Sequence, residues 1–181
     1  MLGMLCLALA DLGMLLGTAD LAAAMSVEAL LGTDRVFAAD LVGLRPQVGQ
    51  AAAAETMTRA LAGSPIMASH RTDTTHIVQD AYSLRCAPQV AGAARDTVAH
   101  ARLVAERELA AVIDNPVVLP DGRVESNGNF HGAPVGYALD FLAIVAADVA
   151  SICERRVDRM LDAGRSHGLP PFLAAEAGVD S

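Results

Sequence analysis

The chain has 181 residues and a net charge of −8, with 53% hydrophobic and only 3% aromatic residues. Without a run of Lys or Arg, this acidic balance argues against a phosphate-binding surface, so we expect no nucleic-acid partner. Few aromatics in an Ala-, Leu- and Val-rich chain favour packed helices over a β-sandwich. We therefore expect a single all-α domain over 1–181, in which long antiparallel helices form a bundle and ordered polar loops carry the site.

The mean hydropathy of +0.38 is high for one domain and raises the question of a membrane segment. The apolar opening Met1–Gly17 lacks a basic flank, contains Asp11 and falls short of the ~20 apolar residues that a span needs. We expect no membrane partner, and instead expect apolar surface to be buried against other subunits or against further chain.

The three cysteines are Cys6, Cys86 and Cys153. Their odd number and wide spacing argue against a disulfide framework or a zinc site, and they suit the reducing cytoplasm.

In the first half of the chain, Met1 to about Met25 has the composition of a helix. Ser26 is a candidate N-cap for a short helix that ends at Gly32. After a connector, 47–61 is predicted to be helical. The polar segment Ile66–Pro88 shows no sustained period and is predicted to be an ordered loop; loops of that length are usually functional or disordered.

The second half begins with a helix predicted from Gln89 to about Ile113, which ends where Pro116 disfavours helical geometry at Asn115. Apolar residues recur there at steps of three and four: Val90, Ala94, Val98, Ala101, Ala105 and Leu109. After the turn-rich segment Leu119–Pro134, the longest helix is expected from about Pro134 to Ala163. It is apolar most of the way round, as in a bundle. Its charged stretch Glu154–Arg159 is expected to be solvated or salt-bridged.

Tyr82 and Arg85 lie three residues apart in the polar loop, so a helical turn brings them to one face. The planar guanidinium of Arg85 matches a carboxylate. A Tyr hydroxyl acts as acid or base only when its surroundings lower its ordinary pKa of about 10. The residue types alone equally allow a surface Arg and a half-buried Tyr that anchors the loop.

Three residues of the later loops, Asn115, Phe130 and His131, are candidates whose types allow several interpretations. Asn115 before a proline is a common turn former, but its amide also suits an oxyanion. Phe130 would serve as a hydrophobic staple for the next helix. No second His lies at metal-ligand spacing from His131, so we expect no metal site.

Taken in order, five segments carry a resemblance: "QDAYSLRCAPQ" (79–89), "ERELAAVIDNPVV" (106–118), "ESNGNFHGAPV" (125–135), "ERRVDRMLD" (154–162) and "GLPPFL" (168–173). From about Ser26 to Ser181 the chain resembles the aromatic amino acid ammonia-lyase family. Its histidine-specific members in actinobacteria are nearest, because His131 follows Phe130 where phenylalanine lyases tend to have Gln. Asn127 departs from the Gly of many members.

The resemblance implies the non-oxidative deamination of L-histidine to urocanate and ammonia, with an electrophilic methylidene-imidazolone group and no metal. It implies catalytic roles for Tyr82, Arg85, Asn115 and Phe130, and substrate-binding roles for Arg85, Gln79 and His131. Arg85 would hold the substrate carboxylate, and Asn115 would donate to the oxygen of the electrophile. The role of Tyr82, as proton carrier or positioning group, stays open.

The family forms its electrophile from Ala-Ser-Gly, which does not occur in these 181 residues. We therefore expect an internal fragment that is inactive alone, with the resemblance implying a homotetramer in which the Tyr82 loop reaches a neighbouring subunit's electrophile. Two alternatives stay open: a phenylalanine or tyrosine lyase or aminomutase of the same family, and a non-catalytic helical assembly fragment.

Overall fold

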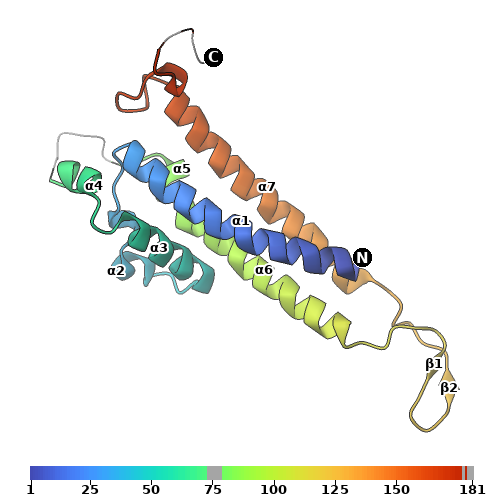
Figure 1. Ribbon diagram of the computed structural model, residues 1–181. Coiled ribbons are helices and arrows are strands. Elements are labelled where there is room, and N and C mark those ends of the chain that lie inside the picture. Colours follow the sequence, from blue (N-terminus) through green and yellow to red (C-terminus); the bar gives the residue numbers. More distant parts are fainter. Residues whose placement is uncertain (73–78, 177, 179–181) are drawn as a thin grey trace.

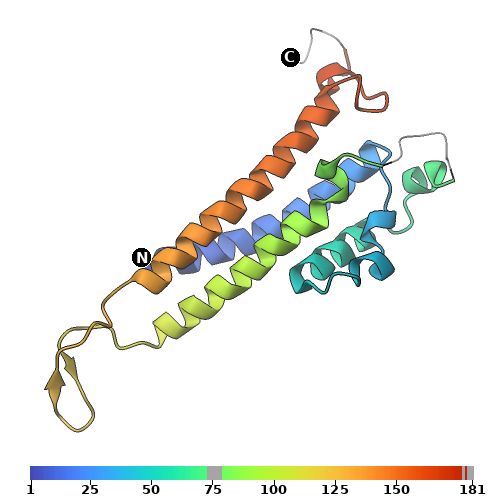
Figure 2. The same ribbon diagram turned by 180° about the vertical axis from the view of Figure 1, so that it is seen from behind.

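Three long helices run along the length of the molecule in the computed structural model, which describes residues 1–72, 79–176 and 178 (Figures 1 and 2). They are α1 (Leu2–Ala29), α6 (Ala87–Leu109) and α7 (Ala133–Leu161). Each packs against the other two. The predicted all-α bundle is confirmed.

The bundle core is built from the apolar periodicity of these helices. Its buried members are Leu5, Leu9 and Leu16 of α1, Ala94, Val98, Ala101 and Ala105 of α6, and Val135, Ala138, Leu142 and Val149 of α7. Alanines on α6 let larger side chains of the two neighbours approach its backbone. The spacing predicted for α6 is confirmed at these four positions, whereas Leu109 at the helix end is 66% exposed.

A second layer covers one end of α1 and α6. Helix α3 (Val48–Leu61) packs on both, and the corner before it holds η1 (Arg35–Phe37) and α2 (Ala39–Val42). The crossing of α3 and α6 is a backbone contact, since a Cβ on Gly49 would lie 2.2 Å from the carbonyl oxygen of Gly92.

Most of the shorter elements lie in or next to the segments predicted as loops, and the one at 171–173 lies beyond them. They are α4 (Pro65–His70), α5 (Tyr82–Arg85), η2 (Pro171–Leu173) and a two-stranded antiparallel hairpin of β1 (Val117–Val118) and β2 (Val124–Glu125). The predicted loop 66–88 is thus wrong at both ends, and 73–78 lies outside the described residues. Helices of four to six residues are too short to show a period.

The predicted cap at Ser26 is wrong. The Ser26 hydroxyl donates back to the Ala22 carbonyl at 2.6 Å, and α1 continues to Ala29. The helix ends where Leu31 adopts a φ of 50°, and the Gly32 N–H donates to the Val27 carbonyl at 2.8 Å. This is a Schellman-type end, so Gly32 does terminate the helical segment as predicted.

The boundaries of α6 also differ from the prediction. The helix begins at Ala87, which places Pro88 within its first turn, and it ends at Leu109, before Ile113. Proline is well tolerated in a first turn, so Pro88 marks a helix start where the sequence suggested a loop end.

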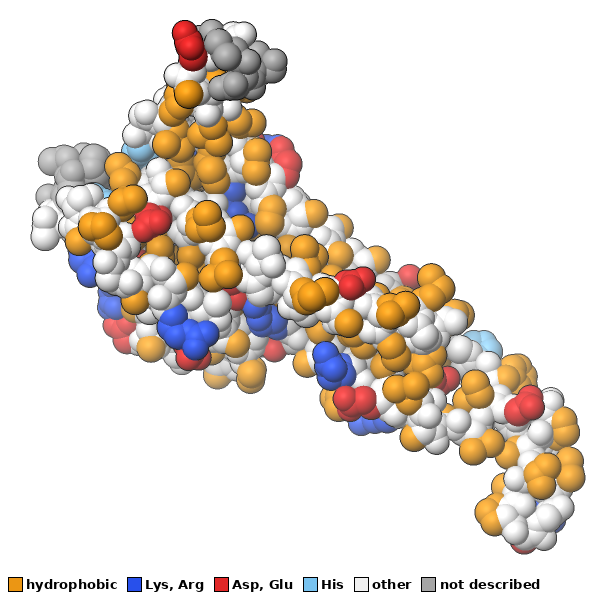
Figure 3. Space-filling view, viewed as in Figure 1, with side chains coloured by type: hydrophobic (Ala, Val, Ile, Leu, Met, Phe, Trp, Pro, Cys, Tyr) orange, Lys and Arg blue, Asp and Glu red, His pale blue; other side chains and the backbone are white. Residues whose placement is uncertain are grey.

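Helices α1 and α7 expose much apolar surface along the molecule (Figure 3). Each is long and apolar enough, by length and composition, to cross a membrane, and only 22% of each apolar window is buried inside the chain. Apolar helices at subunit interfaces have the same composition. In the stretch predicted to be solvated or salt-bridged, Glu154 and Arg155 are exposed and form an ion pair, as predicted. Arg156 is only 3% exposed and donates to Cys153 Sγ at 2.9 Å, so it is not part of a solvated surface.

Candidate active site

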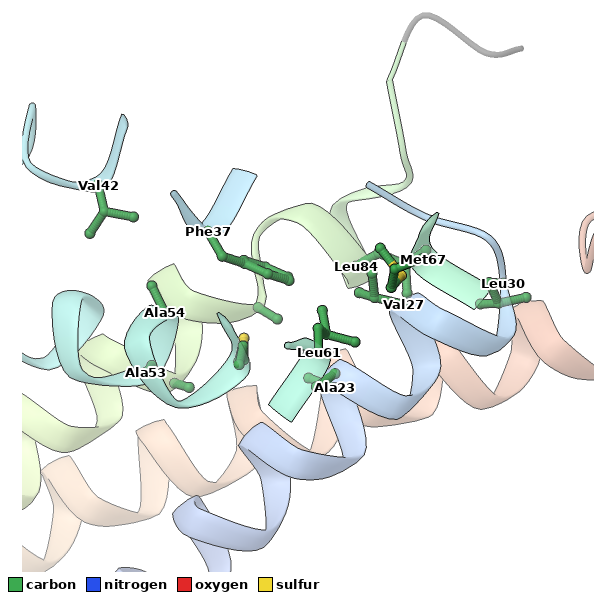
Figure 4. Close-up of a cluster of buried hydrophobic side chains, with 14 residues drawn as sticks. Ala23, Val27, Leu30, Phe37, Val42, Ala53, Ala54, Leu61, Met67 and Leu84 are labelled. Carbon is green, nitrogen blue, oxygen red and sulfur yellow. The ribbon is translucent and has the colours of Figure 1, made fainter. Parts of the chain in front are cut away.

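The two middle residues of the α5 turn, Ser83 and Leu84, are buried, and the turn is anchored by them. Leu84 is 2% exposed and belongs to the buried cluster that contains Val27 and Met67 (Figure 4). Tyr82, by contrast, is 71% exposed. The anchored turn therefore presents the Tyr82 ring outside the core.

Tyr82 and Arg85 are in contact, as their spacing predicted. The Cζ of Arg85 lies 4.5 Å from the centroid of the Tyr82 ring, within the range of a cation–π interaction. The buried Nε of Arg85 has no hydrogen-bond partner in the described part of the chain, and no carboxylate there pairs with its guanidinium. The Nη atoms of the guanidinium are neither buried nor paired among the described residues, so they can donate to a carboxylate from outside the chain. Gln79 lies exposed at the start of the same segment.

Asn115 lies in the loop between α6 and the hairpin, and its amide is oriented by backbone. Its Oδ1 accepts the N–H of Asn127 at 2.9 Å and the hydroxyl of Ser126 at 3.2 Å. A backbone N–H only donates, so this oxygen assignment is fixed and Nδ2 must point elsewhere. No acceptor for Nδ2 is recorded among the described residues, which leaves it as a free amide donor.

Asn127 is the partner that holds this loop. Besides donating its N–H to Asn115, it donates from its own Nδ2 to the Asp114 carbonyl at 2.9 Å. From the sequence, Asn127 stood out only as a departure from a Gly, since contacts that cross 12 and 13 residues of chain are not visible in local spacing.

Phe130 and His131 follow in the same loop, just before α7. Phe130 is 61% exposed, which does not fit a hydrophobic staple. The Nδ1 of His131 accepts the N–H of Ala133 at 3.3 Å, at the first residue of α7, and its ring is exposed.

The two groups of candidate residues lie at opposite ends of the molecule (Figure 1). Helix α6 separates Arg85 from Asn115, and its 23 residues span roughly 35 Å at 1.5 Å per residue. An amino acid is far shorter than that. The structure therefore brings Tyr82 together with Arg85 and Asn115 together with the Phe130 loop, but it does not bring the two groups together within one chain.

A groove among the described residues lies away from both groups. It has a volume of about 690 Å³ and lies between the corner that holds α2 and the outer face of α3, with Phe37, Val42 and Val48 in its wall. None of the residues predicted for the site lines it.

A buried ion pair that the sequence analysis missed joins the long helices. Asp20 of α1, fully buried, accepts from the Nη1 of Arg95 on α6 at 3.1 Å. Burial raises the pKa of the Asp20 carboxyl, and the positive charges of Arg95 and Arg156 lower it by less. The only available signal was an Asp within an apolar helix.

Comparison with known proteins gives a consistent result along the whole chain. Residues 1–181 match the family described as aromatic amino acid lyase. A histidine ammonia-lyase of Streptomyces avermitilis is 69% identical over 181 residues, and one of Anaeromyxobacter is 52% identical over 164. The chain spans 35% and 32% of the length of these two relatives.

Solved structures agree with the sequence matches. A tyrosine aminomutase from Streptomyces globisporus superimposes with a TM-score of 0.88 and 32% identity, over 97% of this chain and 36% of its own. The histidine ammonia-lyase of Trypanosoma cruzi has a TM-score of 0.81 and 36% identity, over 96% and 31%.

Proposed function

We propose, since this chain belongs to the aromatic amino acid lyase family, that it forms the central helical region of a histidine ammonia-lyase. The identity of 69% along all 181 residues to an enzyme of that name carries the proposal. The reaction removes ammonia from L-histidine: the bond from Cα to nitrogen breaks, Cβ gives up a proton, and a carbon–carbon double bond forms in urocanate.

Arg85 is the proposed partner of the substrate carboxylate. Its guanidinium lacks a carboxylate partner among the described residues, although it lies beside an exposed ring on an anchored turn. A carboxylate that leaves water needs a charged, hydrogen-bonded partner, because an unpaired buried charge is very costly. The Tyr82 ring supports the guanidinium through the contact of 4.5 Å, and Gln79 would orient its neighbours just before the same turn.

The loop at the other end fits the electrophilic group of the family. A methylidene-imidazolone, formed from Ala-Ser-Gly, supplies an electron sink for the departing amine when it is present. The free Nδ2 of Asn115 is the donor that a carbonyl or developing oxyanion of such a group requires. The exposed ring of Phe130 and the imidazole of His131 would pack beside the substrate ring.

The proposed site is shared between subunits of a cytoplasmic homotetramer. Within one chain roughly 35 Å of helix separates Arg85 from Asn115. Both act on one substrate only if each site takes Arg85 from one subunit and Asn115 from another.

A second function has an observation in its favour. A tyrosine aminomutase shares the fold at a TM-score of 0.88, so a lyase or aminomutase for tyrosine or phenylalanine is the alternative. The aminomutase is only 32% identical to this chain, whereas the histidine ammonia-lyase is 69% identical, so histidine is favoured as the substrate.

The test is an absorbance assay of the full-length gene product with L-histidine, L-phenylalanine and L-tyrosine at equal concentration. We expect urocanate from L-histidine and no unsaturated acid from the other two. The 181 residues alone are expected to form none. Turnover of tyrosine or phenylalanine with no urocanate would replace the proposal by its alternative.

A further inference from the structure

One peptide group just after α1 is held from both sides by side chains that are distant in sequence. The carbonyl oxygen of Gly32 lies 2.9 Å from the Nε2 of His70. The N–H of Thr33, on the other edge of the same peptide plane, donates to the Oδ2 of Asp80 at 2.8 Å. The two contacts cross 38 and 47 residues of chain, respectively.

The corner is shaped to receive the Asp80 carboxylate. A Cβ on Gly32 would lie 3.3 Å from Asp80 Oδ2 and 3.3 Å from Val27 Cγ1, which is tight on both sides. Asp34, two residues after Gly32, forms an ion pair with Arg71. Residues 32–34 are therefore contacted from both His70–Arg71 and Asp80.

Helix electrostatics does not account for the placement of Asp80. The C-terminal end of a helix carries partial negative charge and disfavours a nearby carboxylate. Asp80 nevertheless lies beside the end of α1, a helix of 28 residues. Its hydrogen bond to the Thr33 N–H, charge-assisted and short, is the interaction that holds it there.

Asp80 lies two residues before Tyr82, and α5 has only four residues. Buried Ser83 and Leu84 fix how deep this short turn lies in the core, and both lie on the C-terminal side of Tyr82. The bond from Asp80 to the end of α1 supplies a second anchor on the other side of Tyr82. Two anchors determine the direction in which Tyr82 and Arg85 are presented.

We propose that Asp80 is a positioning residue of the lyase, which sets the placement of Tyr82 and Arg85 through its hydrogen bond to the Thr33 N–H. This inference rests on the proposed function. It assigns no contact between Asp80 and the substrate. The carboxylate acts by holding the turn that follows it. An uncharged oxygen acceptor at this position, such as an amide oxygen, would still accept from the Thr33 N–H and would hold the turn in part.

The experiment measures kcat/KM for L-histidine in the full-length enzyme with Asp80→Ala, Asp80→Asn and Asp40→Ala. Truncation is expected to lower kcat/KM about 10-fold, and Asn, which keeps an oxygen acceptor, to stay within about 3-fold of wild type. Asp40 pairs with Arg35 on an exposed corner, and its variant is the control with unchanged kinetics. Wild-type kinetics in Asp80→Ala, or an Asn variant as poor as Ala, overturns the inference.

A double-mutant cycle separates positioning from a general structural role. In an Arg85→Ala background, Asp80→Ala should lower kcat/KM by clearly less than the 10-fold expected in the wild-type background, since one of the two groups it positions is gone. A full 10-fold further loss would contradict positioning of Arg85.

Amide hydrogen exchange tests the anchor without reference to activity. Exchange over residues 79–86 should be faster in Asp80→Ala than in Asp40→Ala, with α7 unchanged in both. Equal exchange in the two variants overturns the anchor. An inactive wild-type enzyme with faster exchange in Asp80→Ala would instead refute the proposed function and keep the anchor.

Discussion

Arg85 is the candidate site residue whose charged group lacks an ion-pair partner among the described residues. Its guanidinium stacks on Tyr82 and its buried Nε lacks a partner among the described residues. Lys keeps the charge at this position but loses the planar fork. We expect Arg85→Lys to lower kcat/KM at least ~10-fold in the full-length enzyme, about 1.4 kcal/mol of transition-state stabilisation. Arg85→Ala should cost on the order of 3 kcal/mol.

The two Arg85 variants also separate a catalytic from a stabilising role. A substrate-binding Arg predicts a thermal midpoint close to that of wild type in both. Near-normal kinetics together with a lowered midpoint would show that Arg85 only anchors its loop. Steady-state assays and a melt of each variant decide between the two.

At this scale the sequence predicted the contacts that are local. Because Tyr82 and Arg85 are three residues apart, they were predicted to share a face, and they are in contact. Because Asn115 precedes a proline, it was predicted to lie in a loop, and it does. Asp80 stood in the same quoted segment without a role, because its partner Thr33 is 47 residues away. Spacing arguments reach about one helical turn, so hydrogen bonds across the fold lie beyond them.

The crossing of α3 and α6 depends on two glycines. A Cβ on Gly92 would lie 2.3 Å from the backbone nitrogen of Gln50, and backbone atoms cannot rotate away. We expect Gly92→Ala to lower the free energy of unfolding by about 2–3 kcal/mol through overpacking. Gly13 on α1 has no atom within 4 Å of a built Cβ, so Gly13→Ala is the matched control. It should raise stability by roughly 0.5–1 kcal/mol. Urea unfolding of both variants measures the contrast, and equal effects would contradict it.

The ion pair between α1 and α6 predicts an unusual pH dependence. Burial raises the pKa of Asp20 above its ordinary value of 3.8, so the folded state holds this proton more tightly than the unfolded chain does. The stability it contributes is fully present below that ordinary value and is lost as the pH rises through the folded pKa. The unfolding free energy of wild type, relative to that of Asp20→Asn, should therefore fall as the pH rises above about 4. A difference that grows over that range would show that Arg95 dominates and lowers the pKa.

Among the elements, the three long helices were predictable and their ends were not. Apolar steps of three and four identified α6, since four of the six predicted positions are buried. The end of α1 was misplaced because Ser26 bonds to its own helix and Leu31 takes a left-handed conformation that sequence statistics assign to glycine. These choices depend on local backbone hydrogen bonds that the residue types do not specify.

At the scale of the whole molecule, the long helices expose many large apolar side chains that nothing within the described chain covers. The large exposed side chains of α1 include Met4, Leu7, Met14 and Met25, and those of α7 include Tyr137, Phe141 and Ile144. We expect the full-length protein to be a homotetramer in which these helices form the centre. Light scattering at micromolar concentration measures the mass, and a monomer would contradict the expectation.

The separation of Arg85 from Asn115 makes the shared site testable by subunit mixing. Each of the variants Arg85→Ala and Asn115→Ala is expected to lose most activity, the second by on the order of 10²-fold through loss of an oxyanion donor. When the two are co-expressed, a site that takes Arg85 from one chain and Asn115 from another is intact in about a quarter of cases. Activity should recover to that fraction of wild type.

The control for mixing pairs Arg85→Ala with Tyr82→Ala. Both residues belong to the α5 turn and are in contact, so they enter any site from the same chain. No mixed oligomer then contains an intact turn, and activity should stay at the level of the single variants. If Arg85→Ala and Asn115→Ala also fail to complement, both residues serve one site within a single chain. That result would require a fold that closes the roughly 35 Å along α6, in contradiction to the straight helix between them.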